Sequence, residues 1–406
     1  METTKLDTAE YIRLEDAYGA HNYHPLDVVI QKAEGVWVWD VDGRKYLDFL
    51  AAYSAVNQGH CNPRIRQAVV QQLSNVTLTS RAFRTDQLGP LYKEVHDLTG
   101  YKRMLPMNTG AEAVETAIKA ARKWGYTIKK VPQGQAEILV FTGNFHGRTT
   151  TIVGFSDDEQ YRDGFGPFAP GFTMLPYGDL AAAERAMNPN VVGILVEPIQ
   201  GESGIIIPPD GYLAGLARLC REHRALLITD EIQSGLGRTG KLFACEHEGV
   251  RPDIVIIGKA LAGGFYPVSA ILADDEIMGV FNPGDHGSTF GGNPLGCVAA
   301  REALKVLVED KLVERSAELG AYFLDKLKTI DSAQIKEVRG RGLWIGVELV
   351  PEAGGARRFC EALQQKQLLC KETHEHTIRF APPLCITREE LDWAFERVAA
   401  VFDELG

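Results

Sequence analysis

The sequence lacks long apolar runs, an excess of basic residues and a cysteine framework. No apolar stretch approaches the ~20 residues that a membrane-spanning helix needs. The formal net charge is −11 over 406 residues, which argues against nucleic acid or an anionic membrane as the main partner, because both bind basic surfaces. The seven cysteines are scattered, with no C-x-x-C pair, and this pattern is typical of a reducing compartment.

The amino terminus also lacks a targeting signal. The stretch METTKLDTAEYIRLED is polar and acidic, without the apolar core of a secretory signal or the Arg-rich character of a transit peptide. We therefore expect a cytoplasmic protein. His21 and His24 have helical metal-ligand spacing but no acidic or cysteine partner nearby, so no metal site is expected.

A composition of 45% hydrophobic and 24% charged residues is ordinary for a globular chain of two or three domains. The apolar runs AEILVFT, VVGILVE, ALLITD and DIVIIG predict strands, and helices are expected over 112–126 and 211–224. Apolar strands separated by helices predict an α/β fold with a mainly parallel sheet covered on both faces by helices. After about residue 293 a long helix, two β-rich segments and a final amphipathic helix predict a smaller α+β domain.

Ligands usually bind at the carboxyl ends of such strands. In this chain the four predicted strands run into GNFHGRT, EPIQGE, DEIQSG and GKALAGG. Four neighbouring strands are therefore expected to deliver polar or charged side chains to one edge of the sheet.

The loop DEIQSGLGRTGKL, residues 230–242, fits two phosphate-binding patterns. A nucleoside triphosphate loop needs a Ser or Thr after its lysine to bind magnesium, but Leu242 stands there. A dinucleotide loop should follow its strand directly, whereas Asp230, Glu231 and Gln233 come first. A plain glycine-rich turn is the favoured interpretation, and a nicotinamide-dependent dehydrogenase stays open as an alternative.

Lys259 comes directly after the predicted strand DIVIIG and before the small residues ALAGG. It can be a surface lysine whose amine reaches water, or a desolvated lysine that forms a Schiff base with an aldehyde cofactor. Asp230, at the end of the preceding strand, fits the second interpretation. Pyridoxal phosphate enzymes place a carboxylate against the pyridinium nitrogen, which keeps the ring protonated as an electron acceptor.

A phosphate group has a candidate site where Asn108 and Thr109 precede a helical run. Backbone N–H groups around Gly110 and Ala111 can point at an anion there, with the helix dipole behind them. Thr289, in HGSTFGGNP, is a second candidate donor. The alternatives are a helix cap without a ligand and an ordinary turn.

Together, these residues resemble the class III, fold-type I pyridoxal phosphate aminotransferases that act on ω-amino groups. The matching segments span nearly the whole chain, in the order AHNYHPL, YSAVNQGH, TLTSRAF, NTGAEAVETA, GNFHGRT, VEPIQGE, DEIQSGLGRTG, GKALAGG, HGSTFGGNP and IRFAPPL. The resemblance is closest to the members that use ornithine. It implies a covalent link between Lys259 and the cofactor, and a homodimer with active sites at the subunit interface. It also implies cofactor contacts from Gly110, Ala111, Phe145, Asp230, Gln233 and, from the neighbouring subunit, Thr289.

The resemblance further implies transfer of the δ-amino group of L-ornithine to 2-oxoglutarate. Arg148 would bind the α-carboxylate of ornithine, Tyr23 its α-amine, and Tyr53 would shape the channel. Arg379 would bind the carboxylate beside the reacting carbon of glutamate or 2-oxoglutarate. Glu202 would pair with Arg379 while ornithine is bound and move away for the dicarboxylate.

The resemblance implies a small domain built from both chain ends. We expect a segment at 1–36 that packs with it, a large cofactor-binding domain at 37–290 and a carboxyl-terminal small domain at 291–406. The alternatives are an ω-aminotransferase for acetylornithine or 4-aminobutyrate, and a cofactor-binding regulatory protein without activity. Tyr23 favours ornithine, because a free α-amine needs a hydrogen-bond acceptor.

Overall fold

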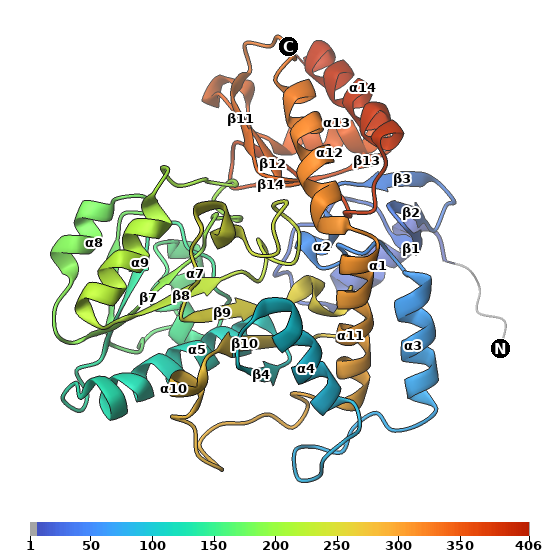
Figure 1. Ribbon diagram of the computed structural model, residues 1–406. Helices are drawn as coiled ribbons and strands as arrows, with labels where there is room; N and C mark the ends of the chain where they lie inside the picture. Colours follow the sequence, from blue (N-terminus) through green and yellow to red (C-terminus); the bar gives the residue numbers. More distant parts are fainter. Residues whose placement is uncertain (1–5, 406) are drawn as a thin grey trace.

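The computed structural model describes residues 6–405 and is built around one seven-stranded sheet (Figure 1). The strand order is β4-β10-β9-β8-β7-β5-β6, and only β10 runs antiparallel to its neighbours. The expected mainly parallel sheet is confirmed, with the four predicted strands at β5, β7, β8 and β9. The strands are β4 (Arg103–Met107), β5 (Glu137–Phe141), β6 (Phe172–Leu175), β7 (Val191–Val196), β8 (Leu226–Asp230), β9 (Ile254–Ile257) and β10 (Ser269–Ala273).

Helices cover both faces of this sheet. Every residue of β7, β8 and β9 is buried, which explains their continuous apolar sequences. Helix α5 (Gly110–Trp124) packs on β9 and β10 and shares a core with Ile228, while α9 (Tyr212–His223) packs on β7 and β8 and shares a core with Leu227. Neighbouring residues of β8 thus face opposite layers.

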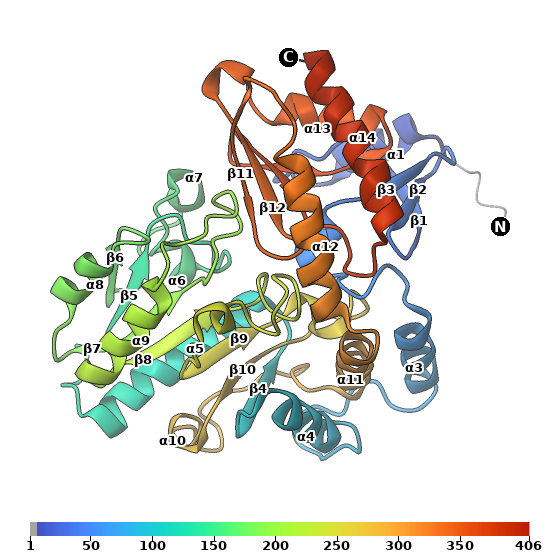
Figure 2. The same cartoon turned by 45° about the horizontal axis from the view of Figure 1, so that its top comes forward.

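Two four-stranded sheets complete the structure (Figure 2). One is antiparallel, in the order β11 (Ile335–Gly340), β12 (Ile345–Leu349), β15 (Thr377–Phe380) and β14 (Lys371–Thr373). The other joins the chain ends, because β1 (Ile30–Glu34), β2 (Trp37–Asp40) and β3 (Lys45–Asp48) are followed in space by β13 (Leu368–Leu369). The domain boundaries at residues 36 and 290 stay a prediction.

The remaining helices are mostly peripheral to the sheets. Among residues 6–405, no helix is long and apolar enough to cross a membrane. The α-helices are α1 (Thr8–Tyr18), α2 (Ala51–Ser54), α3 (Pro63–Leu73), α4 (Leu88–Thr99), α6 (Thr150–Val153), α7 (Glu159–Arg162), α8 (Leu180–Ala186), α10 (Asp275–Met278), α11 (Pro294–Glu309), α12 (Leu312–Leu327), α13 (Arg357–Gln365) and α14 (Arg388–Leu405). Short 3-10 or π turns lie at η1 (Gly125–Lys129), η2 (Ala244–Glu248), η3 (Lys259–Ala262) and η4 (Pro351–Ala353).

The loop at 231–243 is a series of turns, as its glycines suggest, and α12 crosses it closely. One turn further along α12, Gly320 packs against the turn between β11 and β12. A Cβ atom placed there would lie 2.0 Å from the carbonyl carbon of Gly342, far inside van der Waals contact. Gly320 is therefore required by backbone packing rather than by its own backbone conformation.

We expect Gly320→Ala to lower the free energy of unfolding by about 1–3 kcal/mol, because overpacking forces the backbone to move. Gly89→Ala, in the first turn of α4 with no atom within 4 Å of the added Cβ, is the matched control. It should leave stability unchanged or raise it by up to about 1 kcal/mol through helix propensity. Urea unfolding of both variants measures the difference, and equal midpoints would contradict the packing argument.

Candidate active site

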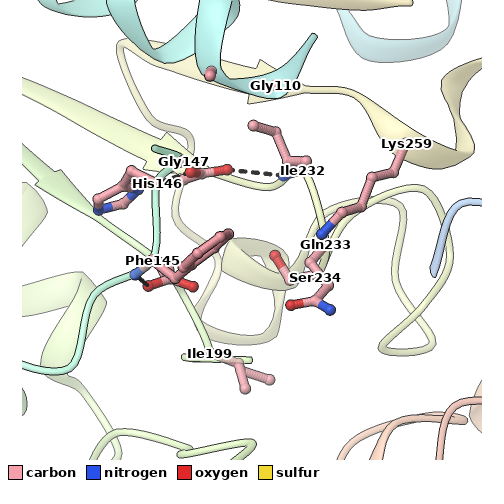
Figure 3. A pocket seen from close by; sticks show the side chains of 12 residues that line it. Gly110, Phe145, His146, Gly147, Ile199, Ile232, Gln233, Ser234 and Lys259 are labelled. Carbon is pink, nitrogen blue, oxygen red and sulfur yellow. Dashed lines mark hydrogen bonds and ion pairs between the residues drawn. The ribbon is translucent and has the colours of Figure 1, made fainter. Parts of the chain in front are cut away.

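A cavity opens at the carboxyl edge of the large sheet (Figure 3). It is lined by an aromatic ring, small residues and a few polar or ionisable side chains, a lining that suits a substituted pyridine ring. Segments that follow β5, β7, β8 and β9 meet there with the start of α5, as the strand pattern predicts. The lining residues are Gly110, Ala111, Phe145, His146, Gly147, Glu197, Ile199, Asp230, Ile232, Gln233, Ser234 and Lys259.

Lys259 enters the cavity from the side opposite Phe145 and His146 (Figure 3). It follows β9 in a left-handed backbone conformation, with a φ of 44°. Such strain in a non-glycine residue is typical of functional sites. Desolvation lowers the pKa of the Lys259 amine, although the carboxylates of Glu202 and Asp230 oppose the shift. A lowered pKa makes the neutral, nucleophilic amine more available.

Asp230 lies at the end of β8 and is almost fully buried. Its Oδ2 atom lies 2.7 Å from Nδ1 of His146, and its Oδ1 atom accepts from the backbone N–H of Ile232 at 3.1 Å. Burial opposes a charge on His146, but the hydrogen bond and negative charge of Asp230 outweigh it and raise the pKa of His146. The imidazole therefore fixes the direction in which the carboxylate points.

The amino end of α5 forms an anion site at the cavity wall. Thr109 caps the helix, and the Glu112 side chain accepts from the backbone N–H groups of Asn108 and Thr109. The N–H groups of Gly110 and Ala111 have no acceptor within residues 6–405. Two free donors at a helix amino terminus fit a phosphate group. Together with Lys259 and Asp230, these donors show that the cavity fits pyridoxal phosphate.

Glu197 is a site residue that the sequence reasoning missed. It follows β7, and its Oε2 atom accepts from the N–H of Phe145 at 3.0 Å. Burial raises the pKa of Glu197 to about 8, with the positive charge of His146 opposing and the negative charge of Asp230 adding to the shift. The signal was present in the sequence, because Glu197 and Asp230 both stand where a parallel strand ends.

A second cluster of charged groups adjoins the cavity. Arg379, on β15, is 1% exposed, and its NH1 group lies 2.7 Å from Oε1 of Glu202. The guanidinium lies 4.8 Å from the ring centroid of Tyr53, within cation–π distance. Burial alone would raise the pKa of Glu202, but the charge and hydrogen bond of Arg379 reverse this and lower it. Gln233 links the two clusters, since its amide lies 3.4 Å from Oε1 of Glu202.

Three predicted site residues lie away from the cavity lining. Tyr23 is 74% exposed. Arg148 is exposed, and its guanidinium lies 4.3 Å from the ring centroid of Tyr161 and 5.7 Å from that of Phe145. Thr289 is also exposed, in the loop before α11. Their roles stay predictions. Within the described part of the chain, no group of three or more His, Cys, Asp or Glu residues could hold a metal ion.

Comparison with known proteins gives a consistent result. The family model described as "Aminotransferase class-III" matches residues 18–402. The ornithine aminotransferase of Brevibacillus brevis is 59% identical over 390 residues, covering 96% of this chain and 97% of that protein. The ornithine aminotransferase of Bacillus subtilis is 57% identical over 392 residues, covering 97% of each.

Solved structures show the same likeness. An ornithine aminotransferase from Toxoplasma gondii, described with partial occupancy of PLP at its active site, superposes with a TM-score of 0.97 at 44% identity, covering 98% of this chain and 95% of that one. An acetylornithine aminotransferase from Elizabethkingia anophelis superposes with a TM-score of 0.90 at 45% identity, covering 99% and 100%. The likeness of structure therefore extends to enzymes named for two related substrates.

The pKa of Glu197 predicts a pH dependence of stability in the cofactor-free protein. Between about pH 4.5 and 8 the unfolded chain has an ionised Glu197 while the folded protein keeps it protonated. Folding then takes up a proton, so this residue makes the folded state progressively less stable as pH rises to 8. Glu197→Gln should remove the loss, because an amide oxygen can still accept from Phe145.

Urea unfolding at pH 5.5 and 8.5 tests this prediction. The wild type should lose more stability than Glu197→Gln between the two values, by an amount on the order of a few kcal/mol. Glu248→Gln is the control for removal of one carboxylate, because Glu248, on η2, also accepts from a backbone N–H, that of Ala214 at 2.9 Å, but does not line the cavity. Parallel pH profiles for the wild type and Glu197→Gln would show that Glu197 is not held protonated.

Proposed function

The chain belongs to the class III aminotransferases, and from this premise we propose that it transfers the δ-amino group of L-ornithine to 2-oxoglutarate through pyridoxal phosphate. The products are glutamate and glutamate 5-semialdehyde, which cyclises to pyrroline-5-carboxylate. The observation that carries the proposal is the ion pair between the buried Arg379 and the partly buried Glu202, beside Lys259. A pocket for two different amino donors needs a carboxylate-binding group that can be masked and unmasked.

Bound pyridoxal phosphate supplies an electron sink that stabilises negative charge on the substrate carbon that loses its proton. In our proposal Lys259 would hold this cofactor through its Nζ atom, and the same amine, when free, would carry the proton to and from the substrate carbon. Asp230, aimed by His146, keeps a proton on the pyridine nitrogen. The N–H groups of Gly110 and Ala111 bind the phosphate.

Phe145 and Gln233 complete the proposed cofactor site. Phe145 lines one wall, where its ring can stack on a pyridine ring, and its backbone is fixed by Glu197. Gln233 offers an amide toward the phenolic oxygen of the cofactor. This amide also contacts Glu202, so the cofactor side and the substrate side of the site are coupled through one side chain.

Ornithine and glutamate present different ends to the same reacting centre. Ornithine must offer its δ-amine, so a free Arg379 would attract its α-carboxylate to the wrong place. Glu202 neutralises Arg379 in the structure and so disfavours that orientation. For glutamate or 2-oxoglutarate, Glu202 moves aside and Arg379 binds the carboxylate through its planar donor fork.

The far end of ornithine is assigned to Arg148, Tyr23 and Tyr53. Arg148 stands over Phe145 and Tyr161 at the outer edge of the cofactor pocket, where it can hold a carboxylate distant from Lys259. Tyr53, whose ring centroid lies 4.8 Å from the guanidinium of Arg379, would shape the channel. Tyr23, in the exposed segment before β1, would accept from the α-amine of ornithine.

We also propose a homodimer with active sites at its interface. Large apolar side chains are exposed on two segments of the chain. These segments adjoin each other, because Leu88 and Arg81 lie beside Gly292, in the loop that also carries Thr289. Such exposed apolar groups are typical of protein interfaces, and Thr289 would thereby reach the phosphate in the partner subunit. The exposed apolar residues are Val70, Leu73, Val76, Leu78, Phe83 and Phe290.

A reducing, cytoplasmic setting is supported by seven free cysteines.

Acetylornithine is the second candidate donor, because a solved acetylornithine aminotransferase is 45% identical to this chain, against 44% for the ornithine aminotransferase from Toxoplasma gondii. The two substrates differ at the α-amine, which is acetylated in one and free in the other. The residues that contact this group, rather than the cofactor site, therefore decide between them.

The visible absorption of the cofactor-loaded protein tests the function directly. Addition of L-ornithine alone should remove the absorption of the resting cofactor within one turnover, and 2-oxoglutarate should restore it. N-acetylornithine and 4-aminobutyrate should react at least about 10-fold more slowly at equal concentration. Lys259→Ala, the control, should bind the cofactor without turnover. A faster reaction with N-acetylornithine would replace ornithine by the second candidate.

The Arg379–Glu202 pair predicts the effect of Glu202→Ala. Without the carboxylate, Arg379 stays free, so α-transamination of glutamate should rise relative to δ-transamination of ornithine, by about 10-fold or more for the loss of one buried charged hydrogen bond. Stopped-flow rates of the two half-reactions give the ratio. Glu159→Ala, an exposed carboxylate that lines the adjoining cavity, controls for the change in charge. An unchanged ratio in Glu202→Ala would refute the masking role.

A further inference from the structure

The glycine-rich loop contains a fully buried arginine that the cofactor site does not use. Arg238 has no carboxylate partner among the described residues. Its NH1 group donates to the carbonyls of Leu343 at 2.8 Å and Pro382 at 2.7 Å, and its NH2 group donates to Oδ1 of Asn57. Burial lowers the pKa of the Arg238 guanidinium, with the carboxylate of Asp48 opposing. A buried charge without a counterion is costly, so its retention needs a reason.

The anchors of Arg238 belong to the segments that carry the substrate-side residues. Pro382 lies three residues after Arg379, and Asn57 lies four residues after Tyr53. These two segments also bind each other through their backbones. The N–H of Ala381 donates to the carbonyl of Phe49 at 2.7 Å, and the N–H of Leu384 donates to the carbonyl of Asn57 at 2.8 Å. Arg238 therefore stands where the supports of Arg379 and Tyr53 meet.

The third anchor connects to the same strand. Leu343 precedes β12, and β12 pairs with β15 so that Gly346 lies opposite Arg379. The backbone of Arg238 is fixed as well, because its carbonyl accepts from Ser316 Oγ at 2.9 Å, and Ser316 Oγ accepts from the N–H of Leu343 at 3.1 Å.

Two glycines allow the loop to pack closely against α12 and against the turn before β12. A Cβ on Gly240 would lie 2.8 Å from Cα of Ala317, and one on Gly342 would lie 2.5 Å from the carbonyl carbon of Thr239. Both also have positive φ angles, of 82° and 57°. The loop that begins at Asp230 and Gln233 is thus a short, close-packed connection from the cofactor side to the substrate side.

Arg379 depends on these supports when Glu202 is away. Its NH1 group contacts Glu202, and its Nε atom has no partner within residues 6–405. Once Glu202 leaves, the direction of the guanidinium is set by the backbone of β15 and by Tyr53. The ornithine half-reaction is less sensitive, because Glu202 then holds Arg379.

We propose that Arg238 is a positioning residue for the recognition of five-carbon dicarboxylates, acting by fixing Arg379 and Tyr53 relative to Asp230 and Lys259. This inference rests on the proposed function, because it uses the two states of Arg379 assigned there. The glycine loop, whose sequence resembles a nucleotide-binding motif, thereby acts in substrate recognition through its buried arginine.

The variants Arg238→Lys and Arg238→Met test the role. Lysine retains the charge but cannot span three acceptors from a planar fork, and methionine retains volume without charge. We expect both to raise the KM for 2-oxoglutarate by about 10-fold or more, while the rate of the ornithine half-reaction changes by less than about 3-fold. Arg238→Lys should retain more of the wild-type affinity than Arg238→Met.

Arg315→Met is the matched control. Arg315, on α12, also donates three hydrogen bonds to the carbonyls of Cys385 and Ile386, on the same stretch of chain, but it makes no contact with the glycine loop in these bonds. It should lower stability without changing the KM for 2-oxoglutarate. An equal rise in KM in Arg315→Met, or none in the Arg238 variants, would overturn the proposal. Asn57→Ala, which removes one acceptor, serves if the Arg238 variants do not fold.

Binding of glutarate, a dicarboxylate that cannot react, separates this inference from the proposed function. Calorimetry on the cofactor-loaded protein should show a Kd for glutarate that rises about 10-fold in Arg238→Met and is unchanged in Arg315→Met. If the wild type binds glutarate in this way but does not react with ornithine, the donor assignment fails while the role of Arg238 stands. Unchanged glutarate affinity in Arg238→Met would overturn the role of Arg238 whatever the donor.

Discussion

The burial of charged groups at the carboxyl edge of the large sheet is the constraint on which the rest of the structure depends. The strands β7, β8 and β9 are buried on both faces, and each delivers an ionisable side chain, Glu197, Asp230 or Lys259, to one cavity. Glu197 and Asp230 are buried there, so each carboxylate must find a partner or change its protonation state. Asp230 pairs with His146, whereas Glu197 has a raised pKa and binds a backbone N–H. The site is therefore held by compensation of charge as much as by packing.

The parts of this site that local patterns reveal could be predicted from the sequence. Apolar runs located the strands, and the position of Asp230 and Lys259 at strand ends placed them at one edge. Glu197 directly follows β7 and obeys the same rule, but nothing in its residue type distinguishes it from Glu202 five residues later. Arg238 could not be found this way. Its acceptors are mostly backbone carbonyls from distant segments. Every residue type has a backbone carbonyl, so the sequence does not identify these acceptors.

The conformation around Tyr53 was equally hidden. The four residues labelled α2, 51–54, are not a right-handed α-helix: all have positive φ angles, from 47° to 70°, although none is glycine. A left-handed turn of this kind costs about 1–2 kcal/mol per residue, so no sequence rule would place it there. Asp48 stabilises the turn, because its Oδ1 atom accepts from the N–H groups of Leu50 and Ala51 while Oδ2 contacts His60 at 2.6 Å. The strain is retained where it holds an aromatic ring over Arg379.

These supports explain how one cavity can accept a cationic diamino acid and a dianionic oxo acid. Burial of the Arg379 charge is costly unless it is compensated. In the proposed function Arg379 has a carboxylate partner in both states: that of Glu202 with ornithine, and that of the substrate with 2-oxoglutarate. The exchange replaces one charged hydrogen bond by another. Its free-energy cost is therefore smaller than the cost of leaving the buried guanidinium without a counterion. Such an exchange requires that Arg379 itself stay in place while its partner changes. The connection that we propose through Arg238 would meet that requirement, and substrate choice would then depend on which of two carboxylates binds Arg379.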